Sequence, residues 1–274
     1  MRSQLIEFAA DNGSLRAELM IPEGEALFPG VVLCHGFGSD HRAMRPTALR
    51  ISRQGVATLS FDFRGHGKSS GFLDGHEARD VTAALEHLRH HPRIDPERIG
   101  LVGHSLGAVA AASAAAEAKY LRALVFLSLP LGTNQRSARF LSAVRDTSAR
   151  VGSHVLEYPR HGPLPGASRF EGVMCVLWMR LRNYRLQVDW EKSLEIWSKL
   201  GVVADIEKLG ASPKLFVHCK GDKIAPYKGV VELYNKVAPP KELLDVERGF
   251  HSSPLLPGRL RKRWISWLVS TLTL

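Results

Sequence analysis

A serine between two glycines is the part of this sequence most suited to chemistry. In the stretch LVGHSLGA, Ser105 stands two residues after Gly103 and two residues before Gly107. A serine hydroxyl is a weak nucleophile unless a base takes its proton. A sharp turn from a strand into a helix exposes the hydroxyl and crowds the residues on both sides, which must then be small. We therefore predict that Ser105 is a nucleophile at a strand-to-helix turn.

A base and an acid follow two later strands of the predicted sheet. His251 comes directly after LLDVERGF, and Asp222 comes after a predicted strand at Leu215–His218. Open α/β folds build their sites beyond the carboxyl ends of the strands. We therefore predict that His251 takes the proton of Ser105 and that Asp222 orients and stabilises the imidazolium. The alternatives are a histidine in a surface loop, an aspartate in a turn, and the rival acids Asp205, Asp245 and Glu247.

The order of strands and helices indicates how these residues are positioned. Alternating residues at Gln4–Ala9 and Leu15–Ile21 predict a hairpin. Apolar strands then alternate with helical patterns, which is typical of a mostly parallel sheet with helices on both faces. The predicted elements are strands at Gly30–Cys34, Val56–Phe61, Arg98–Val102, Ala123–Leu129, Lys214–Val217 and Glu242–Val246, and helices at Pro46–Gln54, Glu77–Arg89, Leu106–Ala118, Tyr227–Val237 and Arg259–Leu272.

The alternation stops between residues 130 and 212, an interval too long for a simple connection between a helix and a strand. The interval holds many arginines and one strongly apolar run, GVMCVLWM at Gly172–Met179. Helical patterns at Asp189–Leu200 and in VADIEKLG favour an inserted, mainly helical cap over a set of surface loops. We therefore predict a core formed by residues 1–129 and 213–274 and a cap formed by residues 130–212.

Several motifs occur in a fixed order along nearly the whole chain. HGFGSD, DFRGHGKSSG, GHSLG, HCKGDKIAP and GFH each follow a predicted strand. Together they resemble the α/β-hydrolase superfamily. Around DFRGHGKSSG the sequence is similar to bacterial cinnamoyl (feruloyl) esterases and to monoacylglycerol-lipase-like and serine-aminopeptidase-like hydrolases. One departure from the pattern is Cys219, which stands where the usual residue is glycine.

The resemblance implies an α/β-hydrolase fold with an eight-stranded type of sheet, and the order Ser105, Asp222, His251 is the one expected for it. It implies a serine hydrolase that cleaves a carboxylic ester, with a small-molecule ester as the partner. The same three residues can also hydrolyse thioesters or peptides, because fold does not fix the substrate. A third alternative is a basic interaction protein on a hydrolase scaffold, although none of the three residues is missing.

An ester hydrolase also needs donors for the oxyanion and a pocket for the acyl group. We predict that the backbone N–H groups of Phe37 and Leu106 form the oxyanion hole, because glycines flank Phe37 and Leu106 begins a helix. HGFG alone is equally compatible with a tight turn. The residues predicted to line an acyl or aromatic pocket, or alternatively to pack the cap onto the core, are Val173, Val176, Leu177 and Trp178.

Other polar motifs are interpreted as structural. His35, His66 and His104 flank the glycine-rich turns, and we expect them to shape those turns by hydrogen bonding. The glycines of Asp62–Gly67 do not have the spacing of a phosphate loop. The sequence therefore implies no metal and no organic cofactor.

The composition limits the class of protein. The chain has 274 residues and a net charge of +10, from 37 Lys and Arg against 27 Asp and Glu. Such a surface can attract nucleic acid or anionic lipid, but no nucleic-acid motif occurs, so we expect no nucleic-acid partner.

The three cysteines are odd in number and lack metal-ligand spacing, which favours a reducing compartment. No signal-peptide pattern and no run of about 18 apolar residues occur, so we expect no transmembrane segment and a cytoplasmic location. The sequence leaves the oligomeric state open, a homodimer included.

Overall fold

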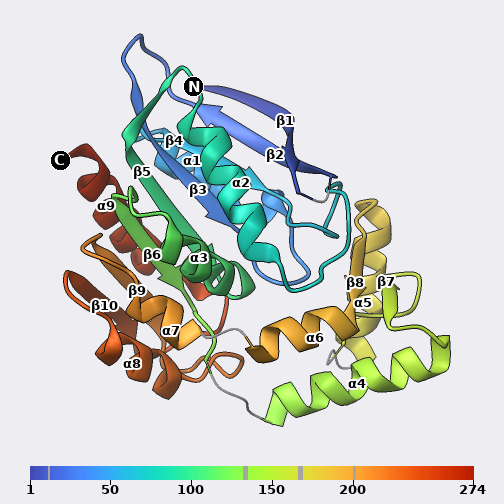
Figure 1. Ribbon diagram of the computed structural model, residues 1–274. Helices are drawn as coiled ribbons and strands as arrows, with labels where there is room; N and C mark the ends of the chain where they lie inside the picture. The colour runs from blue at the N-terminus through green and yellow to red at the C-terminus, as the bar shows by residue number, and fades with distance from the viewer. Residues whose placement is uncertain (12, 132–134, 166–168, 200–201) are drawn as a thin grey trace.

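The computed structural model describes residues 1–11, 13–131, 135–165, 169–199 and 202–274. Its main feature is an eight-stranded sheet with the order β1-β2-β4-β3-β5-β6-β9-β10 (Figure 1). β2 pairs antiparallel with β1 and β4, and the other neighbours are parallel. The strands are β1 (Arg2–Ala10), β2 (Gly13–Ile21), β3 (Phe28–Cys34), β4 (Ala57–Phe61), β5 (Ile94–His104), β6 (Ala123–Leu127), β9 (Lys214–Cys219) and β10 (Lys241–Val246).

Helices cover both faces of this sheet, which confirms the predicted fold class. The helices are α1 (His41–Ser52), α2 (Glu77–Arg89), α3 (Leu106–Glu117), α8 (Tyr227–Lys236) and α9 (Arg259–Thr273). One buried cluster packs α2, α3 and α8 against the strands, and a second cluster packs α1 and α9 against the opposite face. The central strands β3, β4, β6 and β9 are mostly apolar because both of their faces are buried, whereas the edge strands β1 and β10 are partly exposed.

Two predicted element boundaries differ from the structure by four residues or more. α1 begins at His41 and not at Pro46, because the Asp40 side chain caps the helix by accepting from the Arg42 N–H at 3.0 Å. β5 begins at Ile94 and not at Arg98, because Ile94 continues the pairing with β3 opposite Phe28.

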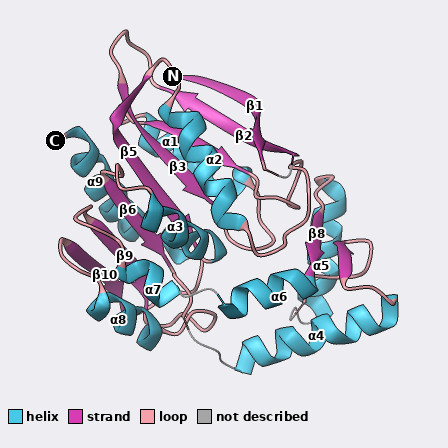
Figure 2. Cartoon of the chain, viewed as in Figure 1, coloured by secondary structure: helices cyan, strands magenta, loops and turns pink. Residues whose placement is uncertain are grey.

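Most of the segment between β6 and β9 forms a group of its own (Figure 2). This group contains α4 (Gln135–Val151), β7 (Val155–Tyr158), α5 (Arg169–Leu181), β8 (Leu186–Asp189) and α6 (Trp190–Lys199). β7 and β8 pair antiparallel as a small second sheet that the sequence analysis did not predict. A third buried cluster holds this group together; its residues are Leu73, Val144, Leu156, Tyr158, Met179, Tyr184, Leu186, Val188 and Trp190.

The last helix of the segment, α7 (Val202–Glu207), lies apart from this group. Ile206 of α7 and Leu209 just after it belong to the core cluster of α2, α3 and α8. A helix between two adjacent parallel strands is the ordinary connection of an α/β fold. The division of the chain into core and cap stays a prediction, and the contacts of α7 favour a cap that ends before α7.

Main-chain hydrogen bonds join β8 to the loop that follows β4. A strand that bonds through its backbone is held at many points regardless of side chains. The four bonds measure 2.8–2.9 Å and run from Gly67 N to Arg185 O, from Gln187 N to Gly65 O, from Leu73 N to Gln187 O and from Asp189 N to Leu73 O.

Glu77, at the start of α2, ties α6 to the core. Its carboxylate accepts from Trp197 Nε1 at 3.0 Å and from the Gly75 N–H at 2.9 Å. Only 2% of Glu77 is exposed. Burial raises the pKa of Glu77 to about 7, although both hydrogen bonds act to lower it.

This raised pKa predicts a loss of stability with rising pH. Between the ordinary pKa of 4.5 and about 7, the unfolded chain releases a proton that the folded chain keeps, so stability falls through this window. Glu77→Gln removes this titrating group. We therefore expect the unfolding free energy of wild type to fall by about 2 kcal/mol relative to that of Glu77→Gln as the pH rises from about 5 to about 8. Urea unfolding at each pH measures it, with the exposed Glu97→Gln as control. A difference that does not vary with pH would contradict the prediction.

Among the described residues, no helix combines the length and apolar character needed to cross a bilayer. Cys34 and Cys219 are buried free thiols, as predicted, and Cys175 is half-buried.

Candidate active site

Ser105 lies on a strained turn between β5 and α3. Its φ of 54° and ψ of −120° are unusual for a residue with a side chain. A Cβ on Gly103 would lie 2.3 Å from the oxygen of Gly107, and a Cβ on Gly107 would lie 2.5 Å from the oxygens of Cys34 and His35. Both positions therefore require glycine, which confirms the predicted crowding on the two sides of Ser105.

Gly107→Ala tests this turn. The new methyl group would meet backbone atoms, which cannot move aside as a flexible side chain can. We expect a loss of about 3 kcal/mol in unfolding free energy. The matched control is Gly210→Ala, because nothing lies within 4 Å of a Cβ there. Equal urea midpoints for the two variants would contradict the prediction.

Ser105, His251 and Asp222 form a continuous row of hydrogen bonds. Ser105 Oγ lies 2.7 Å from His251 Nε2, and His251 Nδ1 lies 2.8 Å from Asp222 Oδ2. The three residues come from the end of β5 and from the loops after β10 and β9. The hydroxyl can donate to Nε2 while the Nδ1–H donates to the carboxylate. The fold thus brings together three residues that are up to 146 positions apart.

The second oxygen of Asp222 is held by the main chain. Asp222 Oδ1 accepts from the N–H groups of Ile224 at 2.8 Å and Ala225 at 3.0 Å. Burial alone would raise the pKa of Asp222. The hydrogen bonds from His251 and from the two backbone groups outweigh burial and leave the pKa below its ordinary value. The carboxylate is therefore ionised and accepts the Nδ1 proton of His251.

The three rival acids have other partners. Asp245 accepts from the Tyr227 hydroxyl, and Glu247 pairs with Lys220. Asp205 accepts from Ser113 at 2.6 Å. In the described part of the chain, Asp222 is thus the acid hydrogen-bonded to the His251 ring.

Cys219, the departure from the motif, lies beneath the histidine loop. A Cβ on Gly249 would come within 2.7 Å of Cys219 Sγ, and Gly249 has a φ of 140°. The thiol therefore fits because residue 249 is glycine. Asp222 and His251 keep their hydrogen bond, so the cysteine does not pull the two loops apart.

Ser128 is a positioning residue that the sequence analysis missed. It follows β6 with a φ of 48° and is fully buried. Its hydroxyl donates to the backbone oxygen of His251 at 2.7 Å, and His104 Nε2 lies 3.1 Å from the same oxygen. Burial, with the nearby His251, lowers the pKa of His104 to about 4, so that ring is neutral. A serine at the end of an apolar strand, in FLSLP, was the available signal.

The backbone N–H groups of Phe37 and Leu106 face no acceptor in the described part of the chain. Leu106 is the first residue of α3, where the helix itself offers none. A Cβ on Gly36 would lie 3.3 Å from Ser105 Cβ, so the loop before Phe37 runs directly against the serine. This arrangement is compatible with an oxyanion hole at Ser105.

His35 and His66 shape the turns beside the site, as predicted. His35 Nδ1 lies 2.8 Å from Gly36 O, and its Nε2 accepts from the Phe63 N–H at 3.1 Å. His66 Nε2 accepts from the Gly38 N–H at 3.3 Å. Each ring therefore joins the loop after β3 to the loop after β4 or closes a turn within one of them.

Aromatic rings of the inserted segment lie over the Phe37 loop. The Phe37 ring centroid lies 5.8 Å from that of Phe140 and 5.9 Å from that of Trp190. The side chains of Phe37 and Leu106 pack against the third cluster. The space around Ser105 is thus bounded on this side by apolar and aromatic groups.

The four residues predicted to line a pocket lie on α5. Val173, Leu177 and Trp178 are 68%, 48% and 38% exposed, and Val176 is half-buried. Met179 is the buried residue that packs α5 into the third cluster. These exposures do not favour the alternative in which the four residues pack the cap onto the core. Their role in substrate binding stays a prediction.

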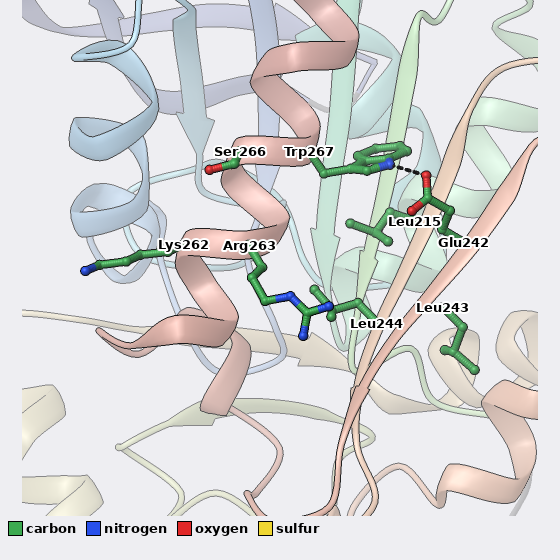
Figure 3. Close-up of a pocket in the computed structure, with 8 residues that line it drawn as sticks. All are labelled: Leu215, Glu242, Leu243, Leu244, Lys262, Arg263, Ser266 and Trp267. Atoms are coloured by element: carbon green, nitrogen blue, oxygen red, sulfur yellow. Dashed lines mark hydrogen bonds between the residues drawn. The ribbon is translucent and has the colours of Figure 1, made fainter.

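A separate hollow of about 400 Å³ lies between β10 and α9 (Figure 3). Trp267 Nε1 donates to Glu242 Oε1 at 2.6 Å across it. The residues around it include none of the predicted site residues; they are Leu215, Glu242, Leu243, Leu244, Lys262, Arg263, Ser266 and Trp267.

Residues 31–259 match the model of a known family, the alpha/beta hydrolase family. Because the match covers most of the chain, the chain belongs to this family. Family and fold agree with the resemblance that the motifs had indicated.

Individual relatives are more distant. The thiohydrolase aneE of Aspergillus aculeatus is 35% identical over 127 residues, which are 44% of this chain and 39% of that protein. The chain spans 38–39% of the length of the first curated relatives that it matches.

Two solved structures share the fold over almost their whole length. The complex of DcsB with its substrate analogue has a TM-score of 0.78 at 20% identity and 99% coverage of both chains. Est1E from Butyrivibrio proteoclasticus with bound ferulic acid has a TM-score of 0.68 at 19% identity and 98% coverage of both chains. At these identities the two likenesses show the fold alone.

Proposed function

We propose that the chain hydrolyses a carboxylic ester through an acyl-enzyme intermediate on Ser105. The observation that carries the proposal is the row of hydrogen bonds from Asp222 through His251 to Ser105. A serine with this base and acid is an activated nucleophile for acyl transfer. The strained turn at Ser105 adds support, because it presents the hydroxyl at the N-terminus of α3.

In the proposed mechanism each group has one role. Ser105 Oγ attacks the carbonyl carbon while His251 Nε2 takes the hydroxyl proton, and His251 then gives that proton to the oxygen of the leaving alcohol. A water molecule, deprotonated by the same nitrogen, attacks the acyl-enzyme, and the proton returns to Ser105. The N–H groups of Phe37 and Leu106 donate to the oxyanion of each tetrahedral intermediate. Asp222 holds the imidazole and stabilises its positive charge.

The surroundings support a small acyl or aromatic-acyl group. The half-buried rings of Phe37 and Phe140 contact each other, and the loop that carries Phe37 runs against Ser105. Aromatic side chains pack well against a planar apolar group. Val173, Val176, Leu177 and Trp178 on α5 extend this apolar region in our proposal.

A thioester is the second candidate substrate. The support for it is the likeness to aneE, which is named a thiohydrolase. The chemistry of the first step is the same, since the serine attacks a carbonyl carbon in both cases. The two candidates differ in the leaving group, an alcohol or a thiol.

A substrate series tests the proposal. Initial rates are measured with p-nitrophenyl esters of increasing acyl length, with feruloyl methyl ester, and with a thioester that carries the preferred acyl group. We expect the highest kcat/KM on one of the oxygen esters. A folded protein that hydrolyses the thioester and none of the esters would replace the first candidate with the second. A folded protein that hydrolyses none of the compounds would contradict both.

A further inference from the structure

Three arginines line a second hollow of about 410 Å³ at α1 and α9. It lies on the sheet face that these two helices cover, and none of the proposed site residues lines it. Its lining residues are Pro46, Leu49, Arg50, Arg53, Gln54 and Arg261.

The positive charge of this hollow has no counter-charge. The lining contains no carboxylate, and no ion pair joins Arg50, Arg53 or Arg261 to an acid in the described part of the chain. Burial lowers the pKa of Arg261, and the charge of Arg50 lowers it further. The guanidinium groups of Arg50 and Arg261 are thus close enough to repel each other. An uncompensated pair of this kind is unfavourable unless an anion joins it.

The arginines that line the hollow also have unused hydrogen-bond donors. Arg261 is 9% exposed, and its Nε is buried without an acceptor. Arg50 Nε is buried without an acceptor as well. One terminal nitrogen of Arg261 donates to the backbone oxygen of Leu255 at 3.1 Å. Both Nε atoms are themselves buried, so the donors left for a ligand in the hollow are the terminal nitrogens of Arg50, Arg53 and Arg261 that have no partner among the described residues.

We propose that this arginine pocket binds a phosphate group carried by a small organic molecule or by a lipid. Guanidinium forks match phosphate oxygens, and three of them suit a dianion better than a carboxylate. The volume leaves room for more than the phosphate itself. Pro46 and Leu49 supply an apolar wall for the organic part. The same chemistry recognises a free phosphomonoester and the headgroup of phosphatidic acid.

Calorimetric titration of the full chain with phenyl phosphate at low salt tests the proposal. We expect binding to wild type and at least a tenfold rise in Kd for Arg261→Gln and for Arg53→Gln. Arg53 is exposed, so its variant stays informative if Arg261→Gln fails to fold. The control is Arg122→Gln, an equal charge change at an exposed position outside the pocket, which should leave the Kd unchanged.

Additional binding experiments identify whether the phosphate belongs to a lipid or to a free molecule. Flotation with vesicles of phosphatidylcholine, with or without phosphatidic acid, tests the lipid source, and loss of flotation in Arg53→Gln would assign it. Binding of phenyl phosphate without flotation would assign a free phosphomonoester. Binding of neither probe, benzoate binding as tight as phenyl phosphate, or an unchanged affinity in a folded Arg53→Gln would overturn the proposal.

Discussion

Ser105→Ala is expected to lower kcat for ester hydrolysis by about 10⁶-fold, because the variant lacks the only atom that forms the acyl-enzyme in the proposed mechanism. The fold should remain, since the glycines and not the hydroxyl set the turn. Initial rates with the best p-nitrophenyl ester of the series measure the effect.

The control is Ser113→Ala, which removes a hydroxyl that is hydrogen-bonded to Asp205 and lies on the same helix outside the site. It should keep the wild-type rate. Turnover by Ser105→Ala within tenfold of wild type would remove Ser105 as the nucleophile.

Asp222→Asn is expected to lower kcat by about 10⁴-fold near neutral pH. The amide has a single oxygen. When that oxygen takes the place of Oδ1, the NH2 group faces His251 Nδ1 and cannot accept its proton, so His251 is no longer held with Nε2 free to take the Ser105 proton. Backbone N–H groups of Ile224 and Ala225 still need an acceptor, which the amide oxygen supplies. The loss should therefore appear in kcat more than in the unfolding free energy.

Asp245→Asn is the matched control for this variant. Asp245 lies on β10 beside the site loops, but its partners are Tyr227 and Lys220. Wild-type kcat is expected for it. Equal losses in the two variants would show that Asp222 acts through local structure and not through His251.

The parts of the site that could be predicted have local signals. The crowding around Ser105 is indicated by the glycines two positions before and after it. The buried parallel strands are indicated by continuous apolar runs. His251 and Asp222 could be placed because strand ends of a parallel sheet meet at one edge. These residues required only the order of strands, not the details of packing.

The remaining features depend on contacts between distant segments. Ser128 acts on a backbone oxygen 123 positions away, and a lone serine gives no sign of that partner. β7 and β8 have four residues each, too few for a periodic pattern. The apolar run of α5 is compatible with burial or exposure, and its neighbours decide between them. The arginine pocket joins Arg50 to Arg261, so neither position indicates it alone.

The backbone hydrogen bonds between β8 and the loop at Gly65–Leu73 have a kinetic consequence. Swinging the whole inserted segment away from the sheet would break all four bonds together, and with them the Trp197–Glu77 contact. In the proposed mechanism a substrate therefore reaches Ser105 while these bonds stay intact. No slow opening of the inserted segment then precedes the reaction, so progress curves should start without a lag.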